Sequence, residues 1–302
     1  MKLHYFSAVP NFGDALNPWL WPQLIGDLLD ADESRLFVGI GSILNPRVPR
    51  ASSYHVFGSG CGYGPIPLVD HRWRFHAVRG PLSARALALP ADAAVTDAAY
   101  LLRTVPLPAP RPGAPIGYMP HFEAMPRVPW RQLVEGLGLR FIDPVAPVPE
   151  VIAEIRGCSN VLAEAMHGAI VADACGVPWI PVATGRHVAD FKWRDWLATV
   201  DLEYRPRRLA RLYRIAPHRP GEGRGAALLR RFLNASALSL QCVPLKRNLS
   251  QLVSAIRSGR TPLQLSTENL RERRTTELRR RLEQMRLEIN TGLPEPAPTR
   301  SP

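Results

Sequence analysis

Short apolar runs alternate with amphipathic segments along most of the chain. Strands are predicted at 2–8, 37–40, 54–57, 74–78, 95–97, 116–119, 139–142, 160–163 and 179–182. Helices are predicted at 15–29, 82–89, 130–136, 149–156, 168–175, 191–196, 226–234 and 249–258. Strands that alternate with helices in this way are typical of parallel sheets, because parallel neighbours need a crossover connection. The pattern therefore predicts an α/β protein.

A proline-rich segment, PLPAPRPGAP at 106–115, interrupts this alternation. Its composition has little potential for helix or strand, so we expect a domain boundary there. The prediction is two Rossmann-like doubly wound domains, 1–108 and 109–262, that face each other across a cleft. A basic helical extension follows at 263–302, with a long charged helix at 268–290 and a disordered end.

Composition indicates a soluble globular protein of the cytoplasm. No apolar run reaches the roughly 18 residues of a membrane helix, and the first residues lack the apolar region of a signal peptide. Four cysteines are scattered without a C-x-x-C pair, so neither a metal site nor a disulfide framework is expected.

The net charge of +12 is concentrated in the last third of the chain. Residues 1–204 carry a net charge of −2, and residues 205–302 carry +14. A neutral body with a basic end indicates docking on an anionic partner, and we expect the surface of a membrane. No nucleic-acid-binding motif is present, so nucleic acid is not an expected partner.

One histidine has surroundings that suggest a chemical role. His167 falls between the predicted strand 160–163 and the predicted helix 168–175. In open α/β sheets, ligands bind beyond the carboxyl ends of the strands, where such a turn lies. The free N–H groups that open the helix at Gly168 also favour an anion. The alternative stays open that His167 caps the helix or fills a gap in the packing.

Several other polar residues and glycines also follow predicted strands. Two glycine-rich loops would allow close approach of a ligand, although neither fits the dinucleotide-binding pattern. Turn and cap chemistry is an alternative explanation for the Asn and Asp residues. The candidates are Asn11, Gly13, Asp14, Ser42, Ser59, Arg79, Asp97 and His121, together with Lys192 in a later aromatic and cationic cluster.

In order and spacing, these motifs resemble the polysaccharide pyruvyl transferase family. The matching residues, which cover roughly 1–200, are Asn11-Phe12-Gly13-Asp14, Gly39-Ile40-Gly41-Ser42, Phe57-Gly58-Ser59-Gly60, Val78-Arg79-Gly80-Pro81, Thr96-Asp97, Pro120-His121 and Ser159 through His167-Gly168 to Pro178. The stretches NFGDALNPWLW and EAMHGAIVADA are similar to members that act on succinoglycan-type exopolysaccharides. The resemblance implies a GT-B-like fold and phosphoenolpyruvate as the donor, with no cofactor. It also implies a pyruvate ketal on a sugar, or on a lipid-linked precursor, as the product.

Carried onto this chain, the resemblance makes His167 the expected catalytic acid. Asp14 or Asp97 is expected to orient or deprotonate the acceptor hydroxyl, and Arg79 is expected to hold the donor anion from the other domain. The sequence departs from the family at Ala165, where members commonly carry arginine. Because the donor carries a carboxylate and a phosphate, Lys192 or Arg186 is expected to supply the missing cation.

Two other functions are compatible with the sequence. A glycosyltransferase that uses a nucleotide-sugar would have the same architecture. A non-catalytic assembly protein for exopolysaccharide would explain the absence of arginine at position 165.

Overall fold

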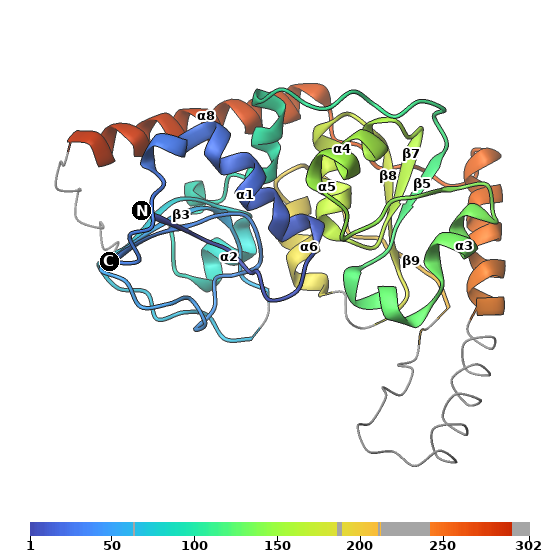
Figure 1. Cartoon of the computed structure of the whole chain (residues 1–302), viewed down its shortest axis with the longest axis horizontal. Helices are drawn as coiled ribbons and strands as arrows, with labels where there is room; N and C mark the ends of the chain where they lie inside the picture. Colours follow the sequence, from blue (N-terminus) through green and yellow to red (C-terminus); the bar gives the residue numbers. More distant parts are fainter. Residues whose placement is uncertain (63, 186–188, 211, 213–241, 292–302) are drawn as a thin grey trace, which may run out of the picture.

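In the computed structural model, described for residues 1–62, 64–185, 189–210, 212 and 242–291, the strands form two sheets (Figure 1). The order in the first sheet is β1 (Lys2–His4), β2 (Arg35–Val38), β3 (Ser53–Ser59) and β4 (Trp73–Val78). The order in the second is β6 (Arg140–Phe141), β5 (Ile116–Met119), β7 (Asn160–Ala163), β8 (Trp179–Ala183) and β9 (Arg207–Arg208). These strands pair in parallel. The predicted α/β class is therefore confirmed, and residues 106–115 lie along the chain between the two sheets.

Helices connect the strands, as the hydrophobic pattern predicts. The α-helices are α1 (Phe12–Ile25), α2 (Pro81–Ala86), α3 (Trp130–Glu135), α4 (Val148–Arg156), α5 (Met166–Ala174), α6 (Asp190–Leu197) and α8 (Glu268–Thr291), and residues 242–257 are also helical. Short 3-10 helices are η1 (Gly26–Leu28), η2 (Ala91–Ala93), η3 (Ala98–Thr104) and η4 (Phe122–Arg127). The helix predicted at 226–234 and the chain end from 292 lie outside the described residues.

Helix α5 lies at the centre of the fold. Eight of its nine residues are buried, and it packs against β7, β8, α1, α4 and η3. Its small and apolar residues allow this close approach on every side. The helix ends before Gly176, whose φ of +74° is readily adopted only by glycine. A side chain carried by α5 is therefore held on a rigid element.

Several predicted strand and helix limits are wrong, including those at His167 and at 95–97. His167 does not lie in the turn before a helix, because α5 begins one residue earlier, at Met166. Residues 95–97 do not form a strand. Ala94 makes only an isolated bridge to Val78, and Asp97 is the N-cap of η3. The carboxylate of Asp97 accepts a hydrogen bond from the N–H of Ala99, which favours the helical turn over an extended conformation.

The long helix α8 packs along the first sheet and is part of the core. Leu278, Leu282 and Met285 on its apolar stripe are buried. The guanidinium of Arg281 donates to the carbonyl of His76 in β4 at 3.0 Å, and that of Arg274 donates to the carbonyl of Thr199 at 2.6 Å. Within the described part of the chain, neither this charged helix nor any other is long and apolar enough to cross a membrane.

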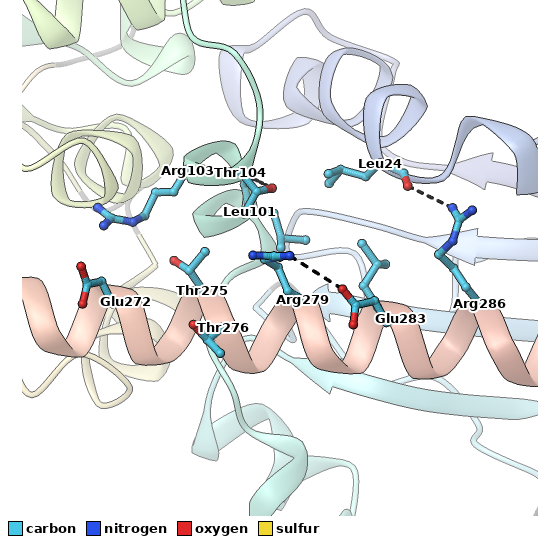
Figure 2. A pocket seen from close by; sticks show the side chains of 11 residues that line it. Leu24, Leu101, Arg103, Thr104, Glu272, Thr275, Thr276, Arg279, Glu283 and Arg286 are labelled. Carbon is cyan, nitrogen blue, oxygen red and sulfur yellow. Dashed lines mark hydrogen bonds and ion pairs between the residues drawn. The ribbon is translucent and has the colours of Figure 1, made fainter.

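A groove of about 690 Å³ runs beside α8, between this helix, α1 and η3 (Figure 2). Three arginines line it. Arg103 donates to the carbonyl of Ala174 at 2.7 Å, and Arg286 donates to the carbonyl of Leu24 at 3.1 Å. Arg279 lies 3.9 Å from the carboxylate of Glu283. The bond from Arg286 to Leu24 ties α8 to α1 along this groove.

Candidate active site

A cavity of about 800 Å³ lies where the carboxyl ends of the two sheets meet. Loops that follow β1 and β2 form one wall, and residues that follow β5 and β7 form the other. This is the position at which open parallel sheets bind ligands. The predicted site residues that line the cavity are Asn11, Gly13, Asp14, Ser42, His121, His167 and Lys192.

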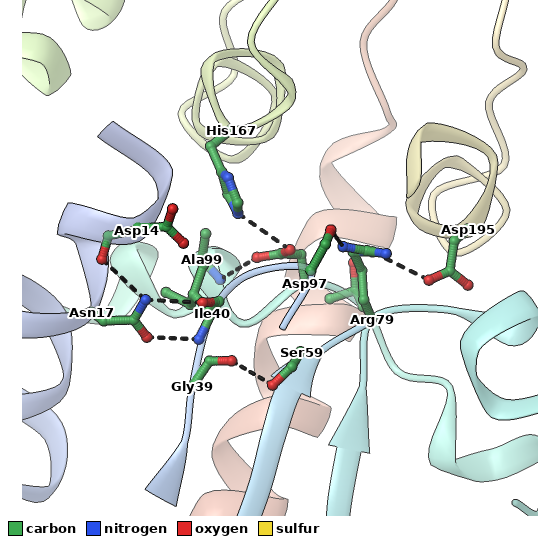
Figure 3. A network of polar contacts seen from close by, with 12 residues as sticks. Asp14, Asn17, Gly39, Ile40, Ser59, Arg79, Asp97, Ala99, His167 and Asp195 are labelled. Carbon is green, nitrogen blue, oxygen red and sulfur yellow. Dashed lines mark hydrogen bonds and ion pairs between the residues drawn. The ribbon is translucent and has the colours of Figure 1, made fainter. Parts of the chain in front are cut away.

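His167 faces a buried carboxylate from the other half of the chain (Figure 3). Its Nε2 lies 3.5 Å from Oδ2 of Asp97, and the Asp97 side chain is fully buried. The other oxygen of Asp97 accepts from the N–H of Ala99 at 3.0 Å. Oδ2 of Asp97 and Nε2 of His167 are both buried and have no hydrogen-bond partner among the described residues. The carboxylate is therefore placed to orient the imidazole through Nε2.

The backbone of α1 packs close to the other nitrogen of this imidazole. A Cβ atom at Gly13 would lie 2.1 Å from Nδ1 of His167, closer than any real contact. Glycine at position 13 is therefore required by the ring that packs on it. The close approach explains why a glycine stands in the first turn of a helix, where it has a low intrinsic propensity.

Asp14 brings a second carboxyl group to the cavity. Its side chain accepts from Nδ2 of Asn11 at 2.6 Å, and its backbone N–H donates to Oδ1 of Asn11, the N-cap of α1, at 3.0 Å. Burial raises the pKa of Asp14, although the hydrogen bond from Asn11 and the charges of His167 and Lys192 act in the opposite direction. A carboxyl with a raised pKa is a better proton acceptor than an exposed one.

Lys192 brings a cation to the cavity from α6, and only 7% of its surface is exposed. Burial and, to a smaller extent, the charge of Arg79 lower the pKa of Lys192 to about 8, although the charges of Asp14 and Glu123 act in the opposite direction. The ammonium group is thus poised close to neutral pH. Arg186, the alternative predicted cation, lies outside the described residues.

Arg79 does not line this cavity, and its predicted contact with the donor anion stays a prediction. Its guanidinium is fully buried and contacts three protein groups. Nε lies 3.2 Å from the carboxylate of Asp195, Nη1 donates to Oγ of Ser42 at 2.6 Å, and Nη2 donates to the carbonyl of Cys61 at 2.5 Å. Each of its three nitrogens contacts a protein group, and the buried guanidinium exposes no edge to the cavity. Its effect on the site is to hold Ser42, which does line the cavity.

Asp195 is the partner that sequence analysis missed. It lies three residues after Lys192 on α6 and is fully buried. Besides Arg79, it accepts from the backbone N–H groups of Leu82 and Ser83, both at 2.9 Å, and from Oγ of Ser83 at 2.5 Å. These bonds fix α6 to the start of α2, and therefore set the position of Lys192.

Ser59 and Gly168, two further predicted site residues, do not line the cavity either. The hydroxyl of Ser59 is buried and donates to the carbonyl of Val38 at 3.0 Å, which joins β3 to β2. At Gly168, a Cβ atom would lie 2.5 Å from Sδ of Met119. Each residue is thus explained by packing or by sheet geometry.

His121 lies in the cavity wall and is tied to a second buried acid. Its Nδ1 accepts from the backbone N–H of Glu123 at 3.3 Å, and the backbone N–H of His121 donates to the carboxylate of Glu164 at 3.1 Å. The other oxygen of Glu164 accepts from the N–H of Thr184 at 2.7 Å. Glu164 therefore links the ends of β5, β7 and β8. Its position directly after an apolar strand was the signal in the sequence.

Asn17 is a further residue that sequence analysis missed. It is fully buried in α1, where its Oδ1 accepts from the N–H of Ile40 at 2.7 Å and from the indole of Trp21 at 3.0 Å. Its Nδ2 donates to the carbonyls of Ile40 and Asp14 at 2.9 and 3.1 Å. These bonds join α1 to the loop after β2 and hold Asp14 in place (Figure 3).

Comparison with known proteins gives one curated relative. The chain is 37% identical over 214 residues to "Succinoglycan biosynthesis protein ExoV" of Rhizobium meliloti (strain 1021), an alignment that covers 69% of this chain and 68% of the relative. No protein-family model and no solved structure matches the chain.

Proposed function

The chain belongs to the family of succinoglycan-type pyruvyltransferases, and from this premise we propose that it transfers pyruvate from phosphoenolpyruvate to a sugar. The product is a pyruvate ketal on an exopolysaccharide repeat unit or on its lipid-linked precursor. One observation carries the proposal. A single cavity holds the imidazole of His167, oriented by Asp97, beside a carboxyl group from Asp14 and a cation from Lys192.

We also propose that the two sheets belong to two domains, 1–108 and 109–262, in a GT-B-like arrangement. The cavity between their strand ends supports this proposal, because its walls come from both halves of the chain. In this arrangement donor and acceptor bind between the domains.

The proposed reaction needs four bond changes at the donor carbons. A proton is added to the methylene carbon of phosphoenolpyruvate, which becomes a methyl group and leaves C2 electron-poor. A sugar hydroxyl then bonds to C2 and releases its proton. The bond from C2 to the phosphate oxygen breaks, phosphate leaves with the electron pair, and a second hydroxyl bonds to C2 as its proton is lost. One donor and two hydroxyls give one ketal and one phosphate, with no oxidant or reductant.

Each step has a residue in the cavity that fits it. His167 is the acid that protonates the methylene carbon, a role that typically contributes about 10²–10⁴-fold to the rate. Asp97 does not contact the substrate and acts as a positioning residue through the imidazole. Asp14, which lines the cavity, accepts the proton of the acceptor hydroxyl. Lys192 binds a negative group of the donor.

The test is phosphate release from phosphoenolpyruvate in the presence of a sugar acceptor, with the methyl signal of the ketal followed by proton NMR. His167→Ala should abolish turnover. His71→Ala is the control and should retain turnover, because it removes an exposed histidine that is distant from His167 in the sequence. More than about a tenth of the wild-type rate in His167→Ala would contradict the assignment. Turnover with nucleotide-sugars instead of phosphoenolpyruvate would indicate a glycosyltransferase, and no turnover with any donor would indicate an assembly protein.

We further propose that the protein works at an anionic membrane surface in the cytoplasm, where the proposed donor is available. The exposed arginines of α8 support this proposal, namely Arg273, Arg279 and Arg280. Each well-placed cation adds about 1 kcal/mol of attraction to an anionic leaflet. Glutamine at these three positions should reduce sedimentation with anionic vesicles and leave zwitterionic vesicles unaffected. Deletion of the helix is a poorer test, because its apolar stripe is part of the core.

A further inference from the structure

We propose that Arg47 binds the phosphoryl group of the donor at the mouth of the cavity. This inference rests on the proposed function and extends it, since it assigns the two ends of the donor to two cations. Arg47 lies in the loop after β2 and lines the same cavity as His167 and Lys192. The predictions from sequence did not include it.

The backbone of this loop is held in one conformation. Oδ1 of Asn45 accepts from the N–H of Arg47 at 2.9 Å, and the N–H of Val48 donates to the carbonyl of Asn45 at 3.2 Å. The N–H of Leu44, the residue before Asn45, donates to the carbonyl of Gly60 at 3.3 Å. Pro46 restricts the chain further. Only the side chain of Arg47 is therefore left to adapt to a ligand.

The charges in the cavity call for a second cation. The acids that line it are Asp14 and Glu123, and Lys192 is the buried cation that faces them. Phosphoenolpyruvate brings a carboxylate and a phosphate that carries about 1.5 to 2 negative charges near neutral pH. Lysine alone cannot balance these groups while two acids remain close.

Arg47 is suited to the phosphate because of its chemistry and its freedom. Its side chain is exposed, and it makes no hydrogen bond or ion pair with any residue in the described part of the chain. A guanidinium can bind two phosphate oxygens at once through parallel N–H groups. This differs from Arg79, whose nitrogens are already bound within the protein.

Depth in the cavity decides which end of the donor each cation holds. Lys192 and His167 lie deep, with 7% and 14% of their side-chain surface exposed, whereas Arg47 lies in the exposed wall. The carbon that receives the proton must lie near His167, and phosphate must leave toward solvent. The carboxylate therefore faces Lys192 and the phosphoryl group faces Arg47.

Calorimetric titration of the whole protein tests this assignment without relying on turnover. Phosphoenolpyruvate, inorganic phosphate and pyruvate are titrated into wild type, Arg47→Gln, Arg47→Lys and Arg50→Gln. The last variant is the matched control, because Arg50 is an exposed arginine of the same loop that does not line the cavity. A charge-assisted bidentate contact accounts for about tenfold or more in affinity.

We expect Arg47→Gln to weaken the binding of phosphoenolpyruvate and of inorganic phosphate by about tenfold or more. The binding of pyruvate should weaken by less than about threefold. Arg47→Lys should recover part of the lost affinity. Equal affinities in Arg47→Gln and Arg50→Gln, or no phosphate binding to wild type, would overturn the inference. Loss of pyruvate affinity instead would overturn the orientation of the donor. If phosphate binds as expected but no pyruvyl transfer is found, the proposed function fails and the anion site stands.

Discussion

Asp97→Asn removes a single charge at the centre of the proposed mechanism. The substitution keeps the size of the side chain, and its amide oxygen can still accept from the N–H of Ala99. The amide NH₂ group then faces Nε2 of His167, where the carboxylate lay. If the imidazole were charged, its Nε2–H group would face the amide NH₂ group, and two donors would oppose each other. The asparagine therefore favours the neutral ring with its proton on Nδ1.

The distance sets the size of the effect. Opposite charges 3.5 Å apart attract by about 4 to 5 kcal/mol at an effective dielectric constant of about 20. That energy corresponds to about a thousandfold in rate, at 1.4 kcal/mol for each factor of ten. Local rearrangement recovers part of it, so we expect kcat to fall by about a hundredfold to a thousandfold.

The assay is the initial rate of phosphate release at saturating donor and acceptor. A positioning role predicts that kcat falls while KM for phosphoenolpyruvate changes by less than about threefold, and that the thermal midpoint stays within about 3 °C. Asp92→Asn is the matched control, because this carboxylate is exposed and lies in the preceding 3-10 helix. A kcat for Asp97→Asn within about fivefold of wild type would refute the role given to the carboxylate.

Three further predictions follow from the same site. Gly13→Ala should lower kcat by about a hundredfold or more, because the added methyl group would displace the ring of His167. Gly26→Ala is the control and should leave kcat unchanged, because a Cβ there meets no atom within 4 Å. Because Lys192 loses its proton as the pH rises through about 8, kcat/KM should fall over that range, and a fall that persists in Lys192→Arg would contradict the assignment. Asp195→Ala should lower the free energy of unfolding by about 3 to 5 kcal/mol in urea, because it leaves a buried guanidinium unpaired; a loss below about 1 kcal/mol would contradict this.

Much of the fold follows from the order of residues along the chain. The strands β5 and β7 have the predicted limits, because each is a short apolar run bounded by polar residues or proline. The predictions fail where a local bond decides the conformation. At 95–97, the N-cap bond of Asp97 starts a helical turn in place of a strand. The residues that α8 packs against could not be predicted, because they come from several distant segments.

Part of the site was also predictable from the order of strands and helices. Residues at strand ends converge in a parallel sheet, and this rule brings His167, Asp14 and His121 to one cavity. This rule does not show which side chains at the strand ends remain accessible to a ligand. Arg79 and Asp195 are 116 residues apart, so their pairing could not be read from either local sequence. Arg47 stands among prolines in an ordinary turn, and only the cavity reveals its position.

The central claim is that the cavity around His167 moves pyruvate from phosphoenolpyruvate to a sugar. The most direct test uses donor labelled with ¹³C at C2 and succinoglycan oligosaccharides whose pyruvate has been removed with mild acid. The account predicts a new ketal carbon signal and an equal amount of phosphate with wild type and with His71→Ala, and neither with His167→Ala. Ketal formation that persists in His167→Ala, or phosphate release without a ketal carbon in wild type, would contradict it.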